Sequence, residues 1–424
     1  MKTFTFIVLF LYLTCFLFSE PGDLIWKYET GAYIDSKPFI NDTSVYIGSN
    51  DCKFYALNAF DGKLIWLYKS GDLIVTTACY EKNIVFFGNF SGYLFALTSS
   101  NGMLEWSYYS GDYTIRSSPC IYNGLIYFGD NNNYVYALTK SNGIEKWKYK
   151  TDGAVRSSPC VSDGVVYVGS NDNYLYAINS SDGTLKWRYQ TGENVSSSPC
   201  VSDGVVYVGS NDTYLYAINC SEGTLKWRYK TSGMVYSSPC VSDGVVYVGS
   251  NDNYLYAINC SDGTFKWRYQ TGDGVFSSPC VSDGVVYTGS YDGYLYVLNS
   301  SDGSLKWRYR GENAGIVNSP IVANGIVYFC SSQFIQAVET YGYTGFKENK
   351  SDSYIPSKSF SISPNPFSIR LSISLPSSGA IYSLTGQLIM KLDKGKHFLD
   401  TSKWREGIYI VKSGMECKRV VKIN

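Results

Sequence analysis

Short apolar stretches alternate with turn residues over most of the chain, and the pattern repeats about every 40 residues. Each apolar stretch is about five residues long, which suits a strand and is too short for a helix. Asp-Gly turns such as Asp163-Gly164 separate neighbouring stretches, and Asp-Gly between β-rich segments favours a hairpin. The pattern therefore predicts four antiparallel strands in each repeat. In the fourth repeat they are expected at Val155–Val161, Val165–Gly169, Tyr174–Ile178 and Leu185–Tyr189.

One tryptophan marks each repeat, and successive tryptophans are 40 or 41 residues apart: Trp26, Trp66, Trp106, Trp147, Trp187, Trp227, Trp267 and Trp307. Four strands in a repeat of this length are typical of a blade of a β-propeller. Seven complete repeats begin at Ile34, and an eighth has only three apolar stretches, near Val317–Val322, Ile326–Phe329 and Phe334–Val338. The missing strand stands at residues 23–28. The sequence thus predicts an all-β, eight-bladed propeller closed by the N-terminal strand, which leaves no open sheet edge.

The end of each repeat carries a recognisable motif. Ala177-x-Asn179-x-x-x-Gly183-x-x-x-Trp187 recurs at Ala217 to Trp227 and at Ala257 to Trp267. It resembles the tryptophan-docking motif of PQQ-like propellers, a family that includes quinoprotein dehydrogenases and the propeller lipoprotein of the outer-membrane barrel-assembly machinery. The resemblance covers residues 21–345 and implies that each tryptophan packs between neighbouring blades. It does not by itself define a function.

The two ends of the chain differ from the repeats. Residues 1–20 combine Lys2 with a single apolar run, Phe4–Phe18, as a secretory signal peptide does, and we expect no transmembrane segment in the mature chain. Residues 346–358 are polar and form a predicted linker. Residues 359–424 predict a small β-sandwich, and the Ser-Pro-Asn-Pro-Phe sequence at 363–367 followed by Gly407–Lys412 resembles the type A C-terminal sorting domain of the type IX secretion system.

That resemblance implies a route and a partner. The chain would cross the periplasm of a Gram-negative bacterium, engage the type IX secretion machinery through its C-terminal domain, and become secreted or attached to the cell surface. A plain accessory sandwich remains the alternative for this tail.

Charge and residue counts exclude several kinds of function. The 36 basic and 36 acidic residues cancel, so nothing indicates nucleic acid binding. His397 is the only histidine, which leaves no histidine for a Ser-His-Asp triad or a histidine metal cluster in the propeller. Near-identical blades place the same side chain around the axis several times, whereas a catalytic site is one unique constellation. We therefore expect no catalytic residues, no metal and no cofactor, and interpret Asn171-Asp172-Asn173 as turn residues.

Twelve cysteines occur in the chain, and six of them share one repeat position: Cys79, Cys120, Cys160, Cys200, Cys240 and Cys280. Blades related by rotation point equivalent side chains the same way round the ring, so these thiols are predicted to be small, buried and unbridged. A bridge between Cys220 and Cys260, which precede the last turn of their blades, is left open.

The repeats differ most at the residue before the Ser-Ser-Pro triplet. Around the ring this position holds Asp35, Val75, Arg116, Arg156, Ser196, Tyr236, Phe276 and Val317. Variation at one rim of a fixed scaffold is how repeat proteins present a ligand surface. We therefore predict a ligand-binding face formed by Asp35, Arg116, Arg156, Ser196, Tyr236 and Phe276. Two arginines could hold carboxylates, and the aromatic rings could stack on sugars or a peptide.

The sequence thus favours an exported, non-catalytic binding or scaffold propeller with an extracellular glycan or peptide ligand. Three alternatives stay open at this point. The rim variation could be drift among recent duplicates, the chain could be a PQQ-dependent quinoprotein oxidoreductase, or it could be a periplasmic scaffold for outer-membrane protein assembly.

Overall fold

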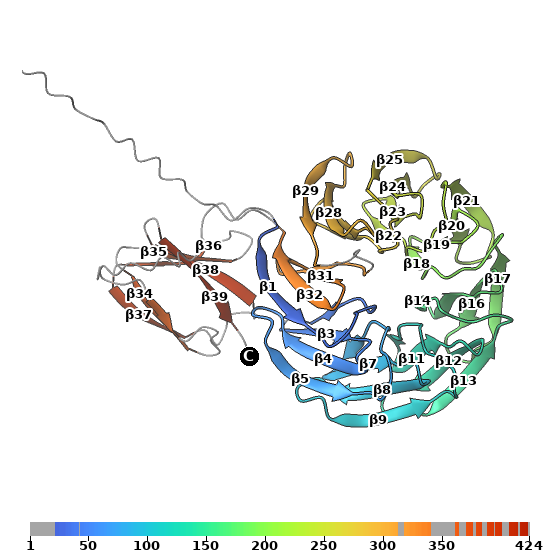
Figure 1. Cartoon of the computed structure of the whole chain (residues 1–424), viewed down its shortest axis with the longest axis horizontal. Coiled ribbons are helices and arrows are strands. Elements are labelled where there is room, and N and C mark those ends of the chain that lie inside the picture. Colours follow the sequence, from blue (N-terminus) through green and yellow to red (C-terminus); the bar gives the residue numbers. More distant parts are fainter. Residues whose placement is uncertain are drawn as a thin grey trace, which may run out of the picture. The chain divides into compact units, whose positions relative to one another are not determined.

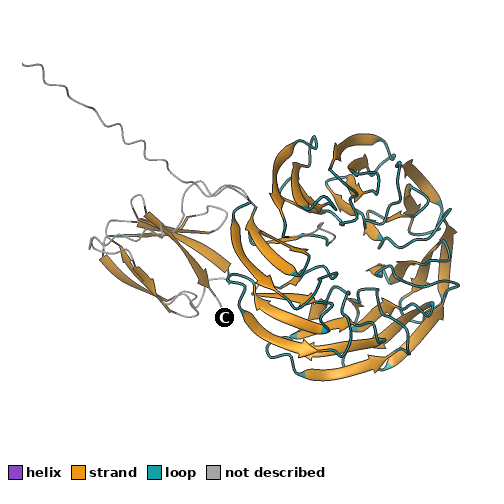
Figure 2. Ribbon diagram, in the orientation of Figure 1, coloured by secondary structure: helices purple, strands orange, loops and turns teal. Residues whose placement is uncertain are grey.

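The computed structural model describes residues 22–41, 43–312 and 318–340, and in the C-terminal part 361–363, 370–375, 379–383, 388–393, 395–400, 407–413 and 416–422. Its residues divide into a unit spanning Leu24–Thr340 and a second unit that holds the remainder. The described residues of both units form strands and loops (Figure 2). Within the described ranges, no helix is long and apolar enough to cross a membrane.

The first unit is a ring of eight four-stranded antiparallel sheets (Figure 1), which confirms the predicted eight-bladed propeller. Blades 1 to 3 are β2 (Phe39–Ile40), β3 (Ser44–Gly48), β4 (Lys53–Asn58) and β5 (Leu64–Lys69); β6 (Cys79–Glu81), β7 (Ile84–Gly88), β8 (Tyr93–Thr98) and β9 (Leu104–Tyr109); and β10 (Cys120–Tyr122), β11 (Leu125–Gly129), β12 (Tyr134–Thr139) and β13 (Glu145–Lys150). Blades 4 and 5 are β14 (Cys160–Ser162), β15 (Val165–Gly169), β16 (Tyr174–Asn179) and β17 (Leu185–Gln190); and β18 (Cys200–Ser202), β19 (Val205–Gly209), β20 (Tyr214–Asn219) and β21 (Leu225–Lys230). Blades 6 and 7 are β22 (Cys240–Ser242), β23 (Val245–Gly249), β24 (Tyr254–Asn259) and β25 (Phe265–Gln270); and β26 (Cys280–Ser282), β27 (Val285–Gly289), β28 (Tyr294–Asn299) and β29 (Leu305–Arg310).

The eighth blade joins the two ends of the propeller. Its strands are β30 (Ile321–Ala323), β31 (Ile326–Ser331), β32 (Phe334–Glu339) and β1 (Leu24–Glu29), and β1 pairs with β32 so that Trp26 lies opposite Ala337. Figure 1 shows the blue strand β1 beside the orange strand β32. The N-terminal strand therefore closes the ring, as the missing fourth strand of the last repeat predicted.

The innermost strands of blades 4 and 8 are shorter than the sequence predicted. In blade 4 we expected Val155–Val161, but β14 spans only Cys160–Ser162, and the residues before it form a bend. Pro159 has no N–H to donate to a ladder. The hydroxyl of Ser157 instead accepts a hydrogen bond at 3.0 Å from the N–H of Gly169 on β15, replacing strand pairing with a side-chain contact. The variable residue before the triplet therefore lies outside the strand.

The core lies between blades rather than within them. One cluster joins Tyr207 and Leu215 of blade 5 to Val246 and Ile258 of blade 6, and Trp227 fills the seam. The indole N–H of Trp227 donates to the carbonyl of Cys260 at 3.0 Å, and seven of the eight tryptophans make the equivalent bond to the next blade. The indole N–H of Trp307 has no acceptor among the described residues. The tryptophans are thus structural, as the family resemblance implied.

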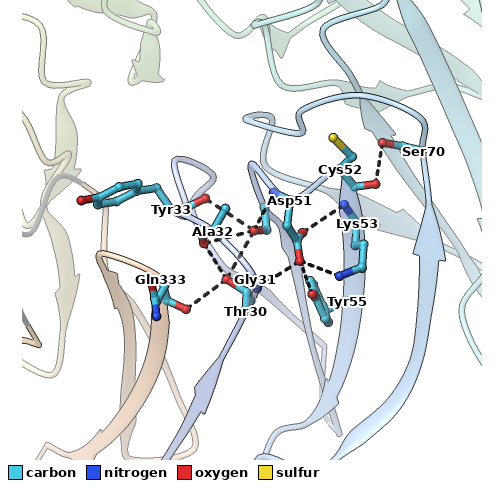
Figure 3. Close-up of polar contacts among 11 residues, drawn as sticks. Thr30, Gly31, Ala32, Tyr33, Asp51, Cys52, Lys53, Tyr55, Ser70 and Gln333 are labelled. Atoms are coloured by element: carbon cyan, nitrogen blue, oxygen red, sulfur yellow. Dashed lines mark hydrogen bonds and ion pairs between the residues drawn. The ribbon is translucent and has the colours of Figure 1, made fainter.

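An aspartate in the turn between the second and third strands links most blades to the loop before them. Figure 3 shows the example at Asp51, whose carboxylate accepts hydrogen bonds from the Tyr55 hydroxyl, the Lys53 ammonium and the Gly31 N–H that follows strand β1. Burial alone would raise the pKa of Asp51, but the hydrogen bond from Tyr55 and those from Lys53 and Gly31 outweigh it, so the pKa lies below its ordinary value. The same contact recurs at Asp172, which accepts from the N–H groups of Tyr174 and Asp152, so these aspartates are turn residues as predicted.

The second unit contains two small antiparallel sheets, in agreement with a small β-sandwich. One sheet has the order β33 (Ser361–Ser363), β34 (Arg370–Leu375), β37 (Gly395–Asp400), and the other β36 (Leu388–Leu392), β35 (Gly379–Ser383), β38 (Gly407–Ser413), β39 (Glu416–Lys422). The predicted strand at Gly407–Lys412 corresponds to β38. The predicted signal peptide, the predicted linker and residues 364–367 lie outside the described residues.

Candidate binding site at the channel mouth

Two sets of residues surround the axis on one face of the propeller. The first ring consists of the variable residues before the Ser-Ser-Pro triplets, namely Asp35, Val75, Arg116, Arg156, Ser196, Tyr236 and Phe276. Val317, the eighth member, lies outside the described residues. The second ring follows the second strand of each blade and consists of Asn50, Phe90, Asn131, Asn171, Asn211, Asn251, Tyr291 and Ser332. Backbone bonds hold the two rings together, because the N–H of a second-ring residue such as Asn171 donates to the carbonyl of Ala154, two residues before Arg156.

Side chains of the two rings contact each other around one side of the mouth. The Asn50 amide donates to the Asp35 carboxylate at 2.8 Å, and Arg156 Nε donates to the side-chain oxygen of Asn131 at 3.3 Å. The Arg116 guanidinium stacks on the Phe90 ring, 4.7 Å from its centroid. Both arginine side chains are exposed toward the channel and, within the described part of the chain, neither makes an ion pair.

The electrostatic surroundings of Arg116 are unfavourable for a cation. Burial lowers the pKa of Arg116, the neighbouring positive charge of Arg156 lowers it further, and Asp35 acts in the opposite direction. The two guanidinium groups are therefore close enough to repel each other, with one carboxylate nearby. An anion placed between them would relieve this repulsion.

The opposite side of the mouth is aromatic. The Tyr236 and Phe276 rings stack with centroids 5.6 Å apart and planes at 25°, and Tyr291 packs edge-on against Phe276 at 4.5 Å. Tyr291 remains 43% exposed. Burial raises the pKa of Tyr291, and the carboxylates of Asp35 and Asp273 raise it further, so this ring lies near the acidic residue of the first ring.

A cavity of about 950 Å³ opens between these residues along the axis. Three predicted site residues line it: Asp35, Arg116 and Arg156. The other three do not, since Ser196 is held by Asn171 at 3.3 Å, and Tyr236 and Phe276 stack on each other at the rim. The structure therefore divides the predicted face into a charged cavity wall and an aromatic rim.

Sequence reasoning missed four residues of the mouth: Lys37, Asn50 and Phe90, which line the cavity, and Tyr291, which lies against Phe276. The signal was present for three of them as departures from the repeat consensus, since Lys37 replaces serine and Phe90 and Tyr291 replace asparagine. These residues stand at other repeat positions than the one before the triplet, so the variation at that position does not reveal them.

The two serines of each triplet have different roles. The first is buried and binds its own blade, as Ser157 does to Gly169. The second faces the channel, and its hydroxyl oxygen accepts a hydrogen bond from the backbone N–H of the preceding blade. For example, the N–H of Ser158 donates to Ser198 Oγ at 2.9 Å. We call these second serines the hydroxyl collar: Ser118, Ser158, Ser198, Ser238, Ser278 and Ser319.

Below the collar lie the cysteines of the shared repeat position. All ten cysteines of the propeller are free. Burial, and to a smaller extent the thiol of Cys240 on the next blade, raise the pKa of Cys200 to about 12. The thiols of Cys200 and Cys240 therefore lie near each other, because the inner strands converge at the axis, but they are not bridged, as the rotational argument predicted. The Cys200 thiol therefore remains protonated at neutral pH and is unreactive as a nucleophile.

The turn cysteines lie in separate seams between blades. Cys220 packs between blades 4 and 5, and Cys260 packs between blades 5 and 6. Both are free, so no bridge links them. Among the described residues, no group of three histidine, cysteine, aspartate or glutamate side chains could hold a metal ion.

A closed eight-bladed β-propeller with a polar axial cavity, tryptophan-docked seams and an N-terminal closing strand defines the class of this protein. Its sequence matches the family model described as outer membrane protein assembly factor BamB, of the PQQ-like repeat type, over residues 14–120, 114–202 and 192–341. The chain belongs to this family. No curated protein matches the chain in sequence.

Solved structures share the fold at low sequence identity. BamB from Moraxella catarrhalis is 19% identical with a TM-score of 0.66, covering 78% of this chain and 99% of that one. The computationally designed Ika8 protein is 14% identical with a TM-score of 0.69, covering 75% of this chain and 99% of that one. The quinohemoprotein alcohol dehydrogenase from Comamonas testosteroni is 13% identical with a TM-score of 0.65, covering 81% of this chain and 79% of that one. The fold is therefore common to non-enzymes and enzymes, and function has to be argued from the site.

Proposed function

We propose that this protein is a non-catalytic binding propeller, exported from a Gram-negative cell to its surface or surroundings, that binds an extracellular glycan or peptide at the channel mouth. The observation that carries the proposal is the pairing of changes between the two rings. Phe90 and Tyr291 depart from the asparagine of the second ring, and these two residues contact Arg116 and Phe276 of the first ring. Independent drift of single loops gives no reason for such pairing.

The chemistry of the mouth supports binding rather than catalysis. Arginine, asparagine, aspartate and exposed tyrosine recognise ligands through charge, hydrogen bonds and stacking. The Cys200 and Cys240 thiols beneath have raised pKa values, because burial disfavours the thiolate. The export part of the proposal rests on the sequence of residues 1–20 and 359–424.

A second candidate function follows from the family. Its model describes an outer membrane protein assembly factor, so a periplasmic scaffold role in outer-membrane protein assembly is the alternative. The two candidates differ in location. The full chain and a chain ending at Lys350 should be expressed in a host with a type IX system and fractionated. Surface or medium location of the full chain alone supports export, whereas periplasmic retention of both favours the assembly scaffold.

Binding is tested on an array of glycans and peptides with the purified protein and two matched variants. Arg156→Ser places at this position the serine that blade 5 has at Ser196, so the variant is expected to fold. Lys226→Ser removes the same charge from the exposed strand β21. We expect at least one ligand whose signal falls about tenfold in Arg156→Ser and is unchanged in Lys226→Ser. If no ligand depends on Arg156, or both variants lose binding equally, the mouth is not the binding site.

A further inference from the structure

The hydroxyl collar presents hydrogen-bond donors to the channel. Each collar oxygen already accepts the N–H of the preceding blade, for instance Ser238 Oγ from Ser198 at 3.0 Å. The hydroxyl proton is left to donate, and none of the described protein groups accepts it. Six such hydroxyls surround the axis at one level, so the protein lines this level with donors.

Lys37 takes the place of the collar serine in blade 1. Burial raises the pKa of the Cys240 thiol, and the positive charge of Lys37, three blades away around the ring, acts in the opposite direction. The ammonium of Lys37 therefore lies over the channel, whose cavity it lines. Like Arg116 and Arg156, Lys37 makes no ion pair within the described ranges. Asp35 is the one carboxylate among the described residues that line the cavity, so three cations face a single acid there.

The groups above the collar suit a sugar. The second ring holds five asparagines, and the side-chain N–H groups of Asn131 and Asn171, whose oxygens already accept from Arg156 and Ser196, are left to donate to sugar hydroxyls. At the rim, Tyr291 presents a partly exposed aromatic ring, on whose face the apolar side of a sugar ring can stack. A peptide of acidic residues would satisfy the cations but offers no sugar ring to stack on Tyr291.

We propose that the ligand is an acidic glycan, an oligosaccharide whose sugars carry carboxylates, with one carboxylate held in the channel by Lys37, Arg116 and the hydroxyl collar. The inference rests on the proposed binding function and names its ligand class. The carboxylate accepts from the collar hydroxyls and balances the excess of cations, while the neighbouring sugar rings lie against the asparagines and Tyr291.

The test is calorimetric titration of the purified protein with trimers of galacturonate, glucuronate and mannuronate, with their methyl esters, and with a triglutamate peptide. The esters keep the sugar shape and remove the charge. Lys37→Ser restores the collar serine that six other blades carry, so folding is preserved, and Lys226→Ser on the outer wall is the charge-matched control. We expect at least one acidic trimer to bind, and its ester to bind at least tenfold more weakly. Lys37→Ser and Arg116→Ser should each weaken binding of the acidic trimer about tenfold, whereas Lys226→Ser should leave it unchanged.

Each other outcome overturns the inference. Equal binding of acid and ester removes the role of the carboxylate, and an equal loss in Lys226→Ser assigns binding to the outer wall. Triglutamate binding as tightly as the sugars replaces a glycan with a peptide. If no acidic trimer binds while the array yields a neutral glycan or a peptide dependent on Arg156, this inference fails and the binding function stands; if neither assay finds a ligand, both fail.

Discussion

The seam between blades 5 and 6 allows the tryptophan docking to be measured by one substitution. Gly263 has φ of +74°, and a Cβ at this position would lie 2.7 Å from Cδ2 and 2.9 Å from Cε3 of Trp227. Trp227 is 8% exposed and bonded to Cys260, so its ring has little room to move. Gly263→Ala therefore adds a strained backbone conformation and an overlap with a fixed ring.

Gly244 separates these two costs. It lies in the same blade with φ of +72°, but a Cβ there meets nothing within 4 Å. Gly244→Ala should cost about 1–2 kcal/mol, the penalty of a left-handed conformation for a residue with a Cβ. Gly263→Ala should cost about 2–5 kcal/mol, because overpacking of a buried contact adds about 1–3 kcal/mol. The difference between the two variants is the cost of displacing Trp227.

The assay is urea unfolding of the full chain, followed by tryptophan fluorescence and far-ultraviolet circular dichroism. Coincidence of the two signals shows whether the ring unfolds as one unit, which is needed before midpoints are converted to free energies. We expect the midpoint of Gly263→Ala to lie clearly below that of Gly244→Ala. Equal midpoints would refute the docking argument, since backbone strain alone would then account for both variants.

Three further predictions concern charge, thiols and the seams. Because the pKa of Asp51 is lowered, its carboxylate contributes fully to stability above the ordinary aspartate pKa of about 4, and this contribution is lost as the pH falls through the lower folded-state pKa. The difference in unfolding free energy between the wild type and Asp51→Asn should therefore shrink from pH 7 to pH 3. A constant difference would contradict this prediction. Cys200, whose pKa is raised to about 12, should react with iodoacetamide at pH 8 far more slowly in the folded protein than in urea. Peptide mass spectrometry measures the two rates, and equal rates would contradict the burial of Cys200. Trp227→Phe should lower stability by about 1 kcal/mol more than Trp307→Phe, because only the first loses a hydrogen bond among the described residues, and equal urea midpoints would count against that bond.

The fold was predictable because the residues that define it repeat. A tryptophan every 40 or 41 residues and Asp-Gly turns at fixed places set the blade, and both central residues of the Asp163-Gly164 turn have positive φ, as a tight hairpin requires. The missing strand of the last repeat predicted the closure by β1. The short inner strands were not predicted, because an apolar run such as Val155–Val161 does not reveal that Pro159 and a serine side chain interrupt its pairing.

The candidate site was predictable only in part. Comparing repeats found the first ring, including Arg116 and Arg156, because variation stands out against near-identical blades. It could not show which second-ring residue lies against which first-ring residue, since that depends on how neighbouring blades meet. Arg156 contacts Asn131 of the blade before it, whereas Asp35 contacts Asn50 of its own blade. The different roles of the two serines likewise required the structure.

A ring of equal blades has no preferred direction, so a specific ligand needs positions where the symmetry is broken. At the second ring, blades 1 and 3 to 6 keep asparagine, while blades 2, 7 and 8 have Phe90, Tyr291 and Ser332. At the level of the collar, serine is kept in blades 3 to 8 and replaced in blades 1 and 2 by Lys37 and Thr77. These departures fall in blades 7, 8, 1 and 2, which are consecutive because strand β1 closes the ring in blade 8. At these two levels the asymmetry therefore lies on one continuous arc of the channel, which is the arrangement that orients a ligand with two different ends.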